Sequence, residues 1–491
     1  MRKISCPKKC LKTPLNIKTE RKPNFKTMKV FNTETRTKEE LIPLEEGKIK
    51  MYACGPTVYN FFHVGNARCF VVFDMLRRYL RYRGYDVTFV QNFTDIDDKM
   101  IKKANEEGTT VKAVAERYIA EYFIDAKGLG IEPASFHPHA TDNIDGIIDI
   151  ISTLIEKGHA YRTDDGVYFR TGSCPNYGKL SHMNRDDLEA GARIEVDSGK
   201  EDPLDFALWK AKKPGEPFWP SPFGEGRPGW HIECSAMSRR YLGESIDIHC
   251  GGQDLTFPHH ENEIAQSECC SGKQFVKYWM HNGYINVDNQ KMSKSLGNFF
   301  TVRDAAAKFG YLPIRFFLLS AHYRTPVNFS AETLAAAKSS LERIFNAKES
   351  LSFYITNAPE GELSADVKAK LDAHKEKFIT VMDDDFNTAD GTSTIFELVS
   401  DVFAWIKDGV SKASVEAAMA LLTELCELMG YVKETNNDDE LIKYIEEQIE
   451  LRKAAKKAKN FAEADRIRDE LAEKGIILKD TREGTTYTIN A

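Results

Sequence analysis

Long apolar segments are missing from this sequence, because no run approaches the roughly 20 residues needed to cross a bilayer. Together with 29% charged residues, this argues against a membrane protein and predicts a soluble one. Tandem repeats and low-complexity tracts are missing as well, which argues against a repeat array. A chain of 491 residues with 42% hydrophobic content is long enough for several domains, each with its own core.

A dense cysteine framework is also absent. The ten cysteines are spaced irregularly in a long chain, unlike those of a small secreted domain. We therefore expect mostly free thiols in a reducing compartment, and a cytoplasmic location. Cys6 and Cys10 have no partner ligands nearby and are interpreted as two exposed thiols.

The chain has no overall basic bias that would indicate a nucleic-acid partner. Its net charge is −7, although residues 1–27 hold nine Lys/Arg against one Glu. Any nucleic-acid surface must therefore be a local basic cluster. Besides the N-terminal segment, one such cluster is the run of Arg452, Lys453, Lys456, Lys457 and Lys459.

Residues 1–27 are expected to form a disordered basic extension. Pro7, Pro14 and Pro23 interrupt any helix, and lysine outnumbers arginine, which weakens a targeting-peptide interpretation. Met28 could be the start of translation, and the role of this segment stays open.

Residues 49–90 predict a strand, a loop, a helix and a second strand. Residues 49–54 have strand character, and 87–90 form the next strand after a stop at Gly84. Between them, apolar residues recur at helical spacing at Ala67, Val71, Met75, Leu76, Tyr79 and Leu80. This unit predicts an α/β fold with a Rossmann-type, doubly wound parallel sheet, whose ligands bind at the carboxyl ends of the strands.

The remaining chain is divided by composition. We expect the first half of the sheet domain in 28–139, an insertion with a Gly/Pro-rich end in 140–228, and the second half in 229–285. Residues 286–334 follow, and then a helical-bundle domain in 335–435. The polar break at 436–439 separates a small α+β module, residues 440–491.

His63-Val64-Gly65-Asn66 lies where a loop enters a helix. A helix N-terminus presents unpaired N–H groups and positive potential to phosphate. His63 and Asn66 could donate hydrogen bonds to an attacked phosphate, and Gly65 allows close approach. Alone, this tetrapeptide is a weak signal, and a capping or packing role for His63 is the alternative.

Lys291-Met292-Ser293-Lys294-Ser295 offers two ammonium groups on a loop that continues into Gly297. Such lysines suit the migrating charge of pyrophosphate. A solvated charge run is the alternative, but a specified five-residue string arises by chance in a chain of this length at roughly 10⁻⁴.

These two strings resemble, in the correct order, the two signature motifs of class I aminoacyl-tRNA synthetases. Asn66 departs from the pattern, since many members carry a second histidine there, but its amide still donates a hydrogen bond. Four further segments resemble cysteinyl-tRNA synthetases, and the resemblance runs from about Met28 to the C-terminus. These segments are Cys54-Gly55-Pro56-Thr57-Val58-Tyr59, residues 92–99 (NFTDIDDK), residues 229–235 (GWHIECS) and residues 257–263 (FPHHENE).

The resemblance implies a single zinc site made of Cys54, Cys234, His259 and Glu263. The residue types support it independently, since thiolate, imidazole and carboxylate are zinc ligands and an i,i+4 spacing places His259 and Glu263 on one helix face. The alternative is that both cysteines are buried small hydrophobic residues.

Zinc would separate cysteine from serine, which an apolar pocket rejects by only about 10–200-fold. A coordinated thiol loses its proton, whereas a serine hydroxyl is a poor ligand. Editing then becomes unnecessary, and the insertion need not hold a hydrolytic site.

Further roles are implied by the same resemblance. The substrate cysteine would lie beside Cys54, Gly55, Thr94 and Trp230, although Trp230 could equally be core packing. ATP, used with Mg²⁺, would be bound by His63, Gly65, Asn66, Gly252, Asp254 and Lys294. Catalytic residues would be His63, Asn66, Lys291 and Lys294, and His231, His249 and His281 could form a second shell around the metal.

The implied activity is that of a cysteine–tRNA ligase, which forms cysteinyl-adenylate from L-cysteine and ATP and then charges tRNA(Cys). Residues 286–334 would carry the signature loop and contact the tRNA stem, and residues 440–491 would bind the anticodon through Arg452, Lys453, Lys456, Lys457 and Tyr487. Family members are usually monomers, so a monomer is implied.

Two other functions stay open on the sequence. A cysteine ligase of mycothiol synthesis would share the catalytic domain but join cysteine to an amino sugar. An acceptor this small would not require the helical region or the basic final module. A non-catalytic RNA-binding paralogue would keep the fold, but the intact signature motifs and metal ligands argue against it.

Overall fold

The computed structural model describes residues 27–183, 199–288, 290–291, 300–433, 437–458, 460–481 and 484–489. The chain divides into two compact units, Met1–Tyr431 and Val432–Ala491. Almost all of the predicted N-terminal extension, residues 1–26, lies outside the described residues. Among the helices described, none is both long enough and apolar enough to cross a membrane.

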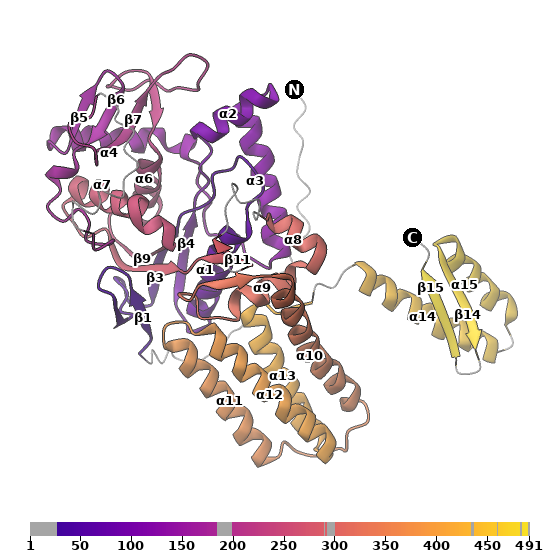
Figure 1. The fold of residues 1–491 in the computed structure, drawn as a ribbon. Helices are drawn as coiled ribbons and strands as arrows, with labels where there is room; N and C mark the ends of the chain where they lie inside the picture. Colours follow the sequence, from indigo (N-terminus) through magenta and orange to yellow (C-terminus); the bar gives the residue numbers. More distant parts are fainter. Residues whose placement is uncertain are drawn as a thin grey trace. The chain divides into compact units, whose positions relative to one another are not determined.

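The first unit is organised around a parallel sheet, which confirms the predicted fold class (Figure 1). In the described part of the chain its strand order is β10-β9-β3-β4, and every neighbouring pair is parallel. The strands are β3 (Lys48–Ala53), β4 (Asp86–Gln91), β9 (Ile246–Gly252) and β10 (Val276–Asn282). Their carboxyl ends therefore meet at one edge, where parallel α/β sheets bind their ligands.

Helices cover both faces of this sheet because the side chains of its buried strands alternate. Met51 and Ala53 of β3 pack in the same apolar cluster as helix α1 (Val64–Tyr82), while Tyr52 packs with helix α6 (Trp230–Leu242) on the other side. All six apolar positions predicted for α1 are buried. The helix that carries the first signature is thus held by one face of the sheet.

Several smaller elements complete this part of the first unit. Strands β1 (Lys29–Asn32) and β2 (Thr37–Glu40) form an antiparallel hairpin. Strand β11 (Ile285–Val287) lies between β12 (Gln290–Lys291) and β13 (Val327–Phe329). The helices are α2 (Asp98–Glu107), α3 (Val111–Gly128), α7 (Glu261–Ser271), α8 (Val302–Phe309) and α9 (Tyr311–Leu319), with short helical turns at Thr171–Ser173, Gln253–Leu255 and Thr256–His260.

The expected insertion contains a sheet of its own, which the sequence interpretation did not foresee. A helical turn (Ala140–Asn143) and helix α4 (Ile144–Glu156) precede an antiparallel sheet of strand order β5-β6-β7-β8. Three of these strands have only three or four residues, which weakens their pattern in the sequence: β5 (Ala160–Thr163), β6 (Gly166–Phe169) and β8 (Gly226–Pro228). The fourth is β7 (Phe206–Ala211).

Helices α10 to α13 form the predicted helical domain (Figure 1). Their bounds are Ala331–Ile355, Ala365–Asp383, Thr388–Asp408 and Lys412–Met429. Ser330 begins α10 with a reciprocal capping box to Thr333. The bundle shares one continuous apolar cluster with the α1 face of the central sheet.

A buried ionic network joins α1, α9 and the end of α13. The Asp74 carboxylate accepts hydrogen bonds from Arg77 (2.7 Å), Arg78 (2.8 Å) and Arg315 (3.1 Å). Burial alone would raise the pKa of Asp74, but the three guanidinium groups outweigh it and hold that pKa well below its ordinary value. Arg315 also donates to the Met429 carbonyl at 2.9 Å, at the last turn of α13.

The second unit is the expected small α+β module. It consists of α14 (Asn437–Lys457), α15 (Phe461–Glu473) and an antiparallel hairpin of β14 (Ile476–Thr481) and β15 (Gly484–Ile489). Its core is small, and its buried members are Ile445, Ile467, Leu471 and Ile476.

The ionic network predicts that Gly430→Ala destabilises the protein more than Gly409→Ala. Both glycines end bundle helices in the left-handed conformation, at φ 70° and 71°, so both alanines incur the cost of that conformation, about 1–2 kcal/mol. A Cβ at position 430 would lie 2.4 Å from Arg315 Nε, whereas at position 409 the nearest atom is 3.9 Å away. We expect Gly430→Ala to cost at least about 2 kcal/mol more, because a buried guanidinium must move away from Asp74.

Urea unfolding followed by circular dichroism measures both variants. Equal losses of stability would mean that the Arg315 contacts at the end of α13 contribute little.

Candidate functional site

Four potential metal ligands from three separate segments come together at the carboxyl edge of the sheet. Cys54 directly follows β3, Cys234 lies in α6, His259 lies in the helical turn before α7, and Glu263 lies in the first turn of α7. One ligand atom from each lies within 4.8 Å of the other three, and all four residues are buried. The structure therefore gathers the four residues that the resemblance implied.

The contacts between these donors are short. The Cys54 and Cys234 sulfurs are 3.7 Å apart, and Cys54 Sγ lies 3.3 Å from Glu263 Oε1. His259 Nε2 lies 3.0 Å from the same carboxylate oxygen. Such a buried set of thiol, imidazole and carboxylate groups is characteristic of metal sites, because buried charges otherwise carry a large desolvation cost.

Mutual contacts shift the protonation of this cluster. A hydrogen bond from Cys54 lowers the pKa of Cys234 to about 6, whereas burial raises the pKa of Cys54. Burial alone would raise the pKa of Glu263, but His249 and His259 outweigh it and lower that pKa to about 2. Burial would lower the pKa of His259, but hydrogen bonds with Cys234 and Glu263 raise it to about 10. The negative charge of Cys234 and Glu263 is thus balanced by the positive charge of His259, a balance that a metal cation would also provide.

A second layer of histidines contacts three of the four donors, namely His259, Glu263 and Cys54. His231 Nδ1 lies 3.0 Å from His259 Nδ1, and His249 Nε2 lies 2.9 Å from Glu263 Oε2. His281 reaches the cluster through His260, whose Nδ1 is 2.7 Å from His281 Nε2. The three histidines that were expected to surround the metal ligands thus all lie in this layer, and His281 is linked to the ligands through His260.

His260 was missed by the sequence interpretation although it stands beside His259. Its Nε2 lies 3.4 Å from Cys54 Sγ. It also belongs to an alternative group of potential ligands, in which Cys54 and Glu263 are joined by His249 and His260. Burial lowers the pKa of His260, which favours the neutral ring.

The residues expected around the substrate cysteine surround the same edge. Trp230 is 42% exposed, and its ring centroid lies 4.4 Å from that of His259. The buried Thr94 hydroxyl donates to Glu233 Oε2 at 3.0 Å, a partner that the sequence interpretation did not include. The Gly55 amide donates to Asn92 Oδ1 at 2.9 Å, and a Cβ at position 55 would lie only 1.6 Å from the Asn92 carbonyl oxygen. Glycine is therefore required where this loop crosses the end of β4.

His63 is the N-cap of α1, and Gly65 and Asn66 lie in the first turn of that helix. His63 Nδ1 accepts a hydrogen bond from the Asn66 N–H at 3.2 Å. In the neutral ring, the proton is therefore on Nε2, which is the nitrogen that can donate. Both proposed roles of His63, capping and donation, are compatible with this geometry.

The segment that follows the second signature pairs with the first. The Val64 N–H donates to the Phe300 carbonyl at 3.2 Å, and the Val302 N–H donates to the Phe62 carbonyl at 3.0 Å. Lys291 lies in β12, but its side chain and all of Lys294 are outside the described residues. The backbone nevertheless brings Phe300 and Val302, which follow the second signature in the chain, beside the first signature.

Arg68, one turn into α1, was not identified from the sequence. It is completely buried, and its guanidinium donates to the carbonyls of Tyr284 (2.8 Å), His322 (3.4 Å), Tyr323 (3.2 Å) and Thr325. Burial lowers its pKa to about 10. Tyr284 immediately precedes β11, so this arginine attaches the first-signature helix to the strand that leads to the second. The sequence did contain one indication that Arg68 is buried, namely its position beside Ala67, next to the apolar stripe of α1.

Gly252 ends β9, and Asp254 lies in the helical turn that follows. Asp254 is exposed, and a Cβ on Gly252 would lie 2.4 Å from its Oδ1. Besides burial, the nearby Asp254 carboxylate raises the pKa of Cys69 in α1. These two residues, which were expected to bind ATP, therefore lie at the carboxyl edge, close to the first-signature helix.

In the second unit, Lys453, Lys456 and Lys457 are exposed on α14. Arg452 is only 5% exposed, so its guanidinium does not share that surface. Tyr487 is partly buried against the small core, opposite Leu478, and Lys459 lies outside the described residues.

Comparison with known families assigns both main parts of the first unit. Residues 40–339 match the family model described as tRNA synthetases class I (C) catalytic domain, and residues 377–433 match the DALR domain. Among solved structures, the chain is similar to Mycobacterium tuberculosis methionyl-tRNA synthetase in complex with methionyl-adenylate, with a TM-score of 0.56 and 16% identity over 78% of this chain and 90% of that one. At this identity the similarity concerns the fold alone.

Curated relatives are similar over nearly their whole length. The cysteine–tRNA ligase of Clostridioides difficile (strain 630) is 58% identical over 465 residues, covering 94% of this chain and 99% of that protein. The cysteine–tRNA ligase of Lachnoclostridium phytofermentans is 55% identical over 469 residues, with the same coverage. The chain therefore belongs to the cysteine–tRNA ligase family of class I aminoacyl-tRNA synthetases.

Proposed function

We propose that this chain joins L-cysteine to ATP, with Mg²⁺, to form cysteinyl-adenylate and pyrophosphate, and then transfers cysteine to the 3′ end of tRNA(Cys), acting as a monomer. The observation that carries the proposal is the buried cluster of Cys54, Cys234, His259 and Glu263 at the carboxyl edge of the sheet. A thiol-selective metal site at the ligand-binding edge of the sheet is what a cysteine-activating enzyme requires.

The four donors fit one zinc ion. With zinc–sulfur bonds of about 2.3 Å, two thiolates on a tetrahedral ion lie about 3.8 Å apart. The 3.7 Å between Cys54 and Cys234 agrees with that value, and the shorter contacts of Glu263 agree with the shorter bonds of nitrogen and oxygen ligands. His231 and His249 orient His259 and Glu263, as ligating groups usually require.

Selection of cysteine over serine follows from this donor set. When bound, zinc supplies a Lewis acid that takes a thiol as thiolate and ligates a hydroxyl poorly. The chain's own residues shape the site: Gly55 lets the loop after β3 cross the end of β4, and Trp230 covers His259 from the exposed side. We propose that Thr94 contributes through the buried pair that it makes with Glu233.

Adenylate formation depends on the start of α1. The N-terminal N–H groups of α1 and the Nε2–H of His63 would stabilise charge on the attacked phosphate, together with the Asn66 amide. Gly65, Gly252 and Asp254 would hold the nucleotide. Lys291 and Lys294 would neutralise the departing pyrophosphate.

We further propose that residues 140–228 form a non-editing insertion within the catalytic domain formed by 28–139 and 229–285. Residues 286–334 would carry the signature loop and contact the tRNA stem, and the bundle in 335–435 would precede the anticodon-binding module in 440–491. The exposed Lys453, Lys456 and Lys457 of that module would contact phosphates.

Purified protein should contain one zinc per chain, and Cys234→Ala should lose it. Cys250→Ala is the matched control, because Cys250 is an equally buried thiol in β9 that belongs to neither group of potential ligands. Metal analysis measures both. In the cobalt-substituted protein, cysteine should change the visible spectrum and serine should not. Zinc that survives Cys234→Ala, or is lost equally from Cys250→Ala, would contradict the proposed ligand set.

His63→Ala should lower kcat for pyrophosphate exchange by about 10²–10³, the effect of losing one transition-state donor, with little change in KM for cysteine. His63→Asn separates this role from capping, because asparagine is a good N-cap but cannot supply the same Nε2–H. We expect His63→Asn to restore stability without restoring the rate. Recovery of kcat in His63→Asn would assign His63 to capping alone.

The full chain should release pyrophosphate with cysteine and ATP and should charge tRNA(Cys). Removal of residues 437–491 should leave pyrophosphate exchange nearly unchanged, because adenylate chemistry uses the first unit. Charging should fall at least about tenfold, equivalent to one lost base–aromatic stack. Replacing Lys456 and Lys457 by glutamine should raise KM for tRNA and flatten its salt dependence. Unchanged charging by the truncated chain would exclude this module as the anticodon reader.

A further inference from the structure

A continuous row of hydrogen-bonded side chains leads from the metal cluster to the β1–β2 hairpin. Cys54 Sγ lies 3.4 Å from His260 Nε2. The other nitrogen of that ring, Nδ1, lies 2.7 Å from His281 Nε2. His281 Nδ1 lies 2.8 Å from the hydroxyl oxygen of Thr33. The row therefore ends at a residue that neither the proposed ligand set nor the signature segments include.

Thr33 stands in the turn between β1 and β2, and this turn is attached to the central sheet. Its N–H donates to the carbonyl of Trp279 in β10 at 2.8 Å. The neighbouring Asn32 is 2% exposed, and its side chain donates to the Lys277 carbonyl and accepts from the Trp279 N–H, both at 3.1 Å. Because β10 also carries His281, these main-chain contacts set the position of Thr33 relative to that ring.

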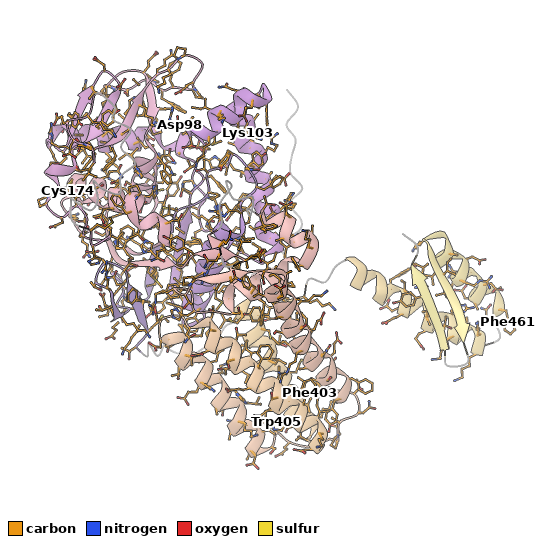
Figure 2. All side chains as sticks on the ribbon, viewed as in Figure 1. Asp98, Lys103, Cys174, Phe403, Trp405 and Phe461 are labelled. Atoms are coloured by element: carbon orange, nitrogen blue, oxygen red, sulfur yellow. The ribbon has the colours of Figure 1, made fainter. Side chains whose placement is uncertain are left out.

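The insertion also contacts this turn. Cys174 marks the part of the insertion from which the contacting segment continues (Figure 2). In that segment His182 Nε2 lies 3.3 Å from the Thr33 carbonyl oxygen. The adjacent Ser181 N–H donates to the Glu261 carboxylate, in the first turn of α7, at 2.8 Å. The backbone of Thr33 is therefore attached to β10 directly and to α7 through the insertion.

The row of hydrogen bonds has a direction, because a neutral imidazole has one donor nitrogen and one acceptor nitrogen. Burial lowers the pKa of His260 and lowers that of His281 to about 3, which favours neutral rings. A zinc-bound Cys54 is a thiolate, which can only accept. His260 Nε2 must then donate to that sulfur, and His260 Nδ1 accepts from His281 Nε2. This leaves His281 Nδ1 as the acceptor for the Thr33 hydroxyl, which is the terminal donor of the row.

We propose that Thr33 is a positioning residue of the metal site, which acts through His281 to orient His260 so that its Nε2–H points at the Cys54 sulfur. This inference rests on the zinc site of the proposed function. A hydrogen bond to a thiolate is charge-assisted and stronger than one to a thiol, so the row stabilises the zinc-bound form more than the metal-free form. The β1–β2 hairpin thus contributes to metal binding, although none of the proposed ligands belongs to it.

Thr33→Val tests this role, because valine keeps the shape of threonine but has no hydroxyl. We expect the zinc affinity of the full chain, measured by competition with a chelator, to fall about fivefold, the difference between a charge-assisted and a neutral hydrogen bond. In the cobalt-substituted protein, the thiolate-to-cobalt absorption band should move to longer wavelength, because a thiolate without that hydrogen bond gives up electrons more readily. Thr33→Ser keeps the hydroxyl and should behave like the unaltered protein.

Thr35→Val is the matched control, because Thr35 lies in the same turn and its hydroxyl contacts that of Thr37 at 3.0 Å. It should change neither the affinity nor the spectrum. A double-mutant cycle tests the path: in His281→Phe protein, Thr33→Val should have no further effect on zinc affinity. Additive losses in that cycle, equal effects of Thr35→Val, or an affinity and a spectrum that Thr33→Val leaves unchanged would each overturn the proposal.

Both measurements are made without cysteine, ATP or tRNA. Variants that leave metal binding unchanged would therefore contradict the role of Thr33 and not the proposed function. Conversely, a protein in which Thr33→Val weakens zinc binding as expected, but which does not charge tRNA(Cys), would contradict the proposed function alone.

Discussion

The parallel pairing of β3 with β4 and β9 is the constraint on which the site depends. Parallel strands end at the same edge, so the chain that leaves each strand begins at the place where ligands bind. Cys54 follows β3, Thr94 follows β4, and Gly252 closes β9. A slip of one residue would exchange the two faces of a strand and move Cys54 to the side of α1, away from α6 and α7. The register of the sheet therefore selects the face on which the metal ligands meet.

Buried arginines fix the position of α1, the helix that carries the first signature, relative to the rest of the first unit. Arg68 binds carbonyls that flank β11 and β13, and Asp74 binds the guanidinium groups of Arg77, Arg78 and Arg315. A buried charge is costly unless it is fully hydrogen-bonded, so each group fixes the backbone that it contacts. α1 is consequently attached to both the approach to the second signature and the helical bundle. The N-terminus of α1 can then keep a fixed position while substrate binds and leaves.

Local patterns were sufficient to predict the elements that position the site. The helical spacing from Ala67 to Leu80 predicted the buried face of α1, and residues 87–90 lie within β4. The i,i+4 spacing of His259 and Glu263 predicted a contact that the structure has at 3.0 Å. These features depend on periods that are visible in the sequence itself. The signature strings and the metal ligands, in contrast, required resemblance to a family, because no local pattern joins Cys54 to Cys234.

The residues that could not be predicted owe their positions to contacts between distant segments. A charge run does not indicate which face of a helix is buried, and Arg452 is buried beside exposed lysines. Cys54 and Cys250 provide the sharpest example, since both lie at the ends of neighbouring strands. Cys250 is in register with Ala53, and its thiol packs on the face of α1, whereas Cys54, one residue further along, packs on the opposite face beside Cys234. Strand register, which neither composition nor spacing contains, decides which of these two cysteines can reach the metal cluster.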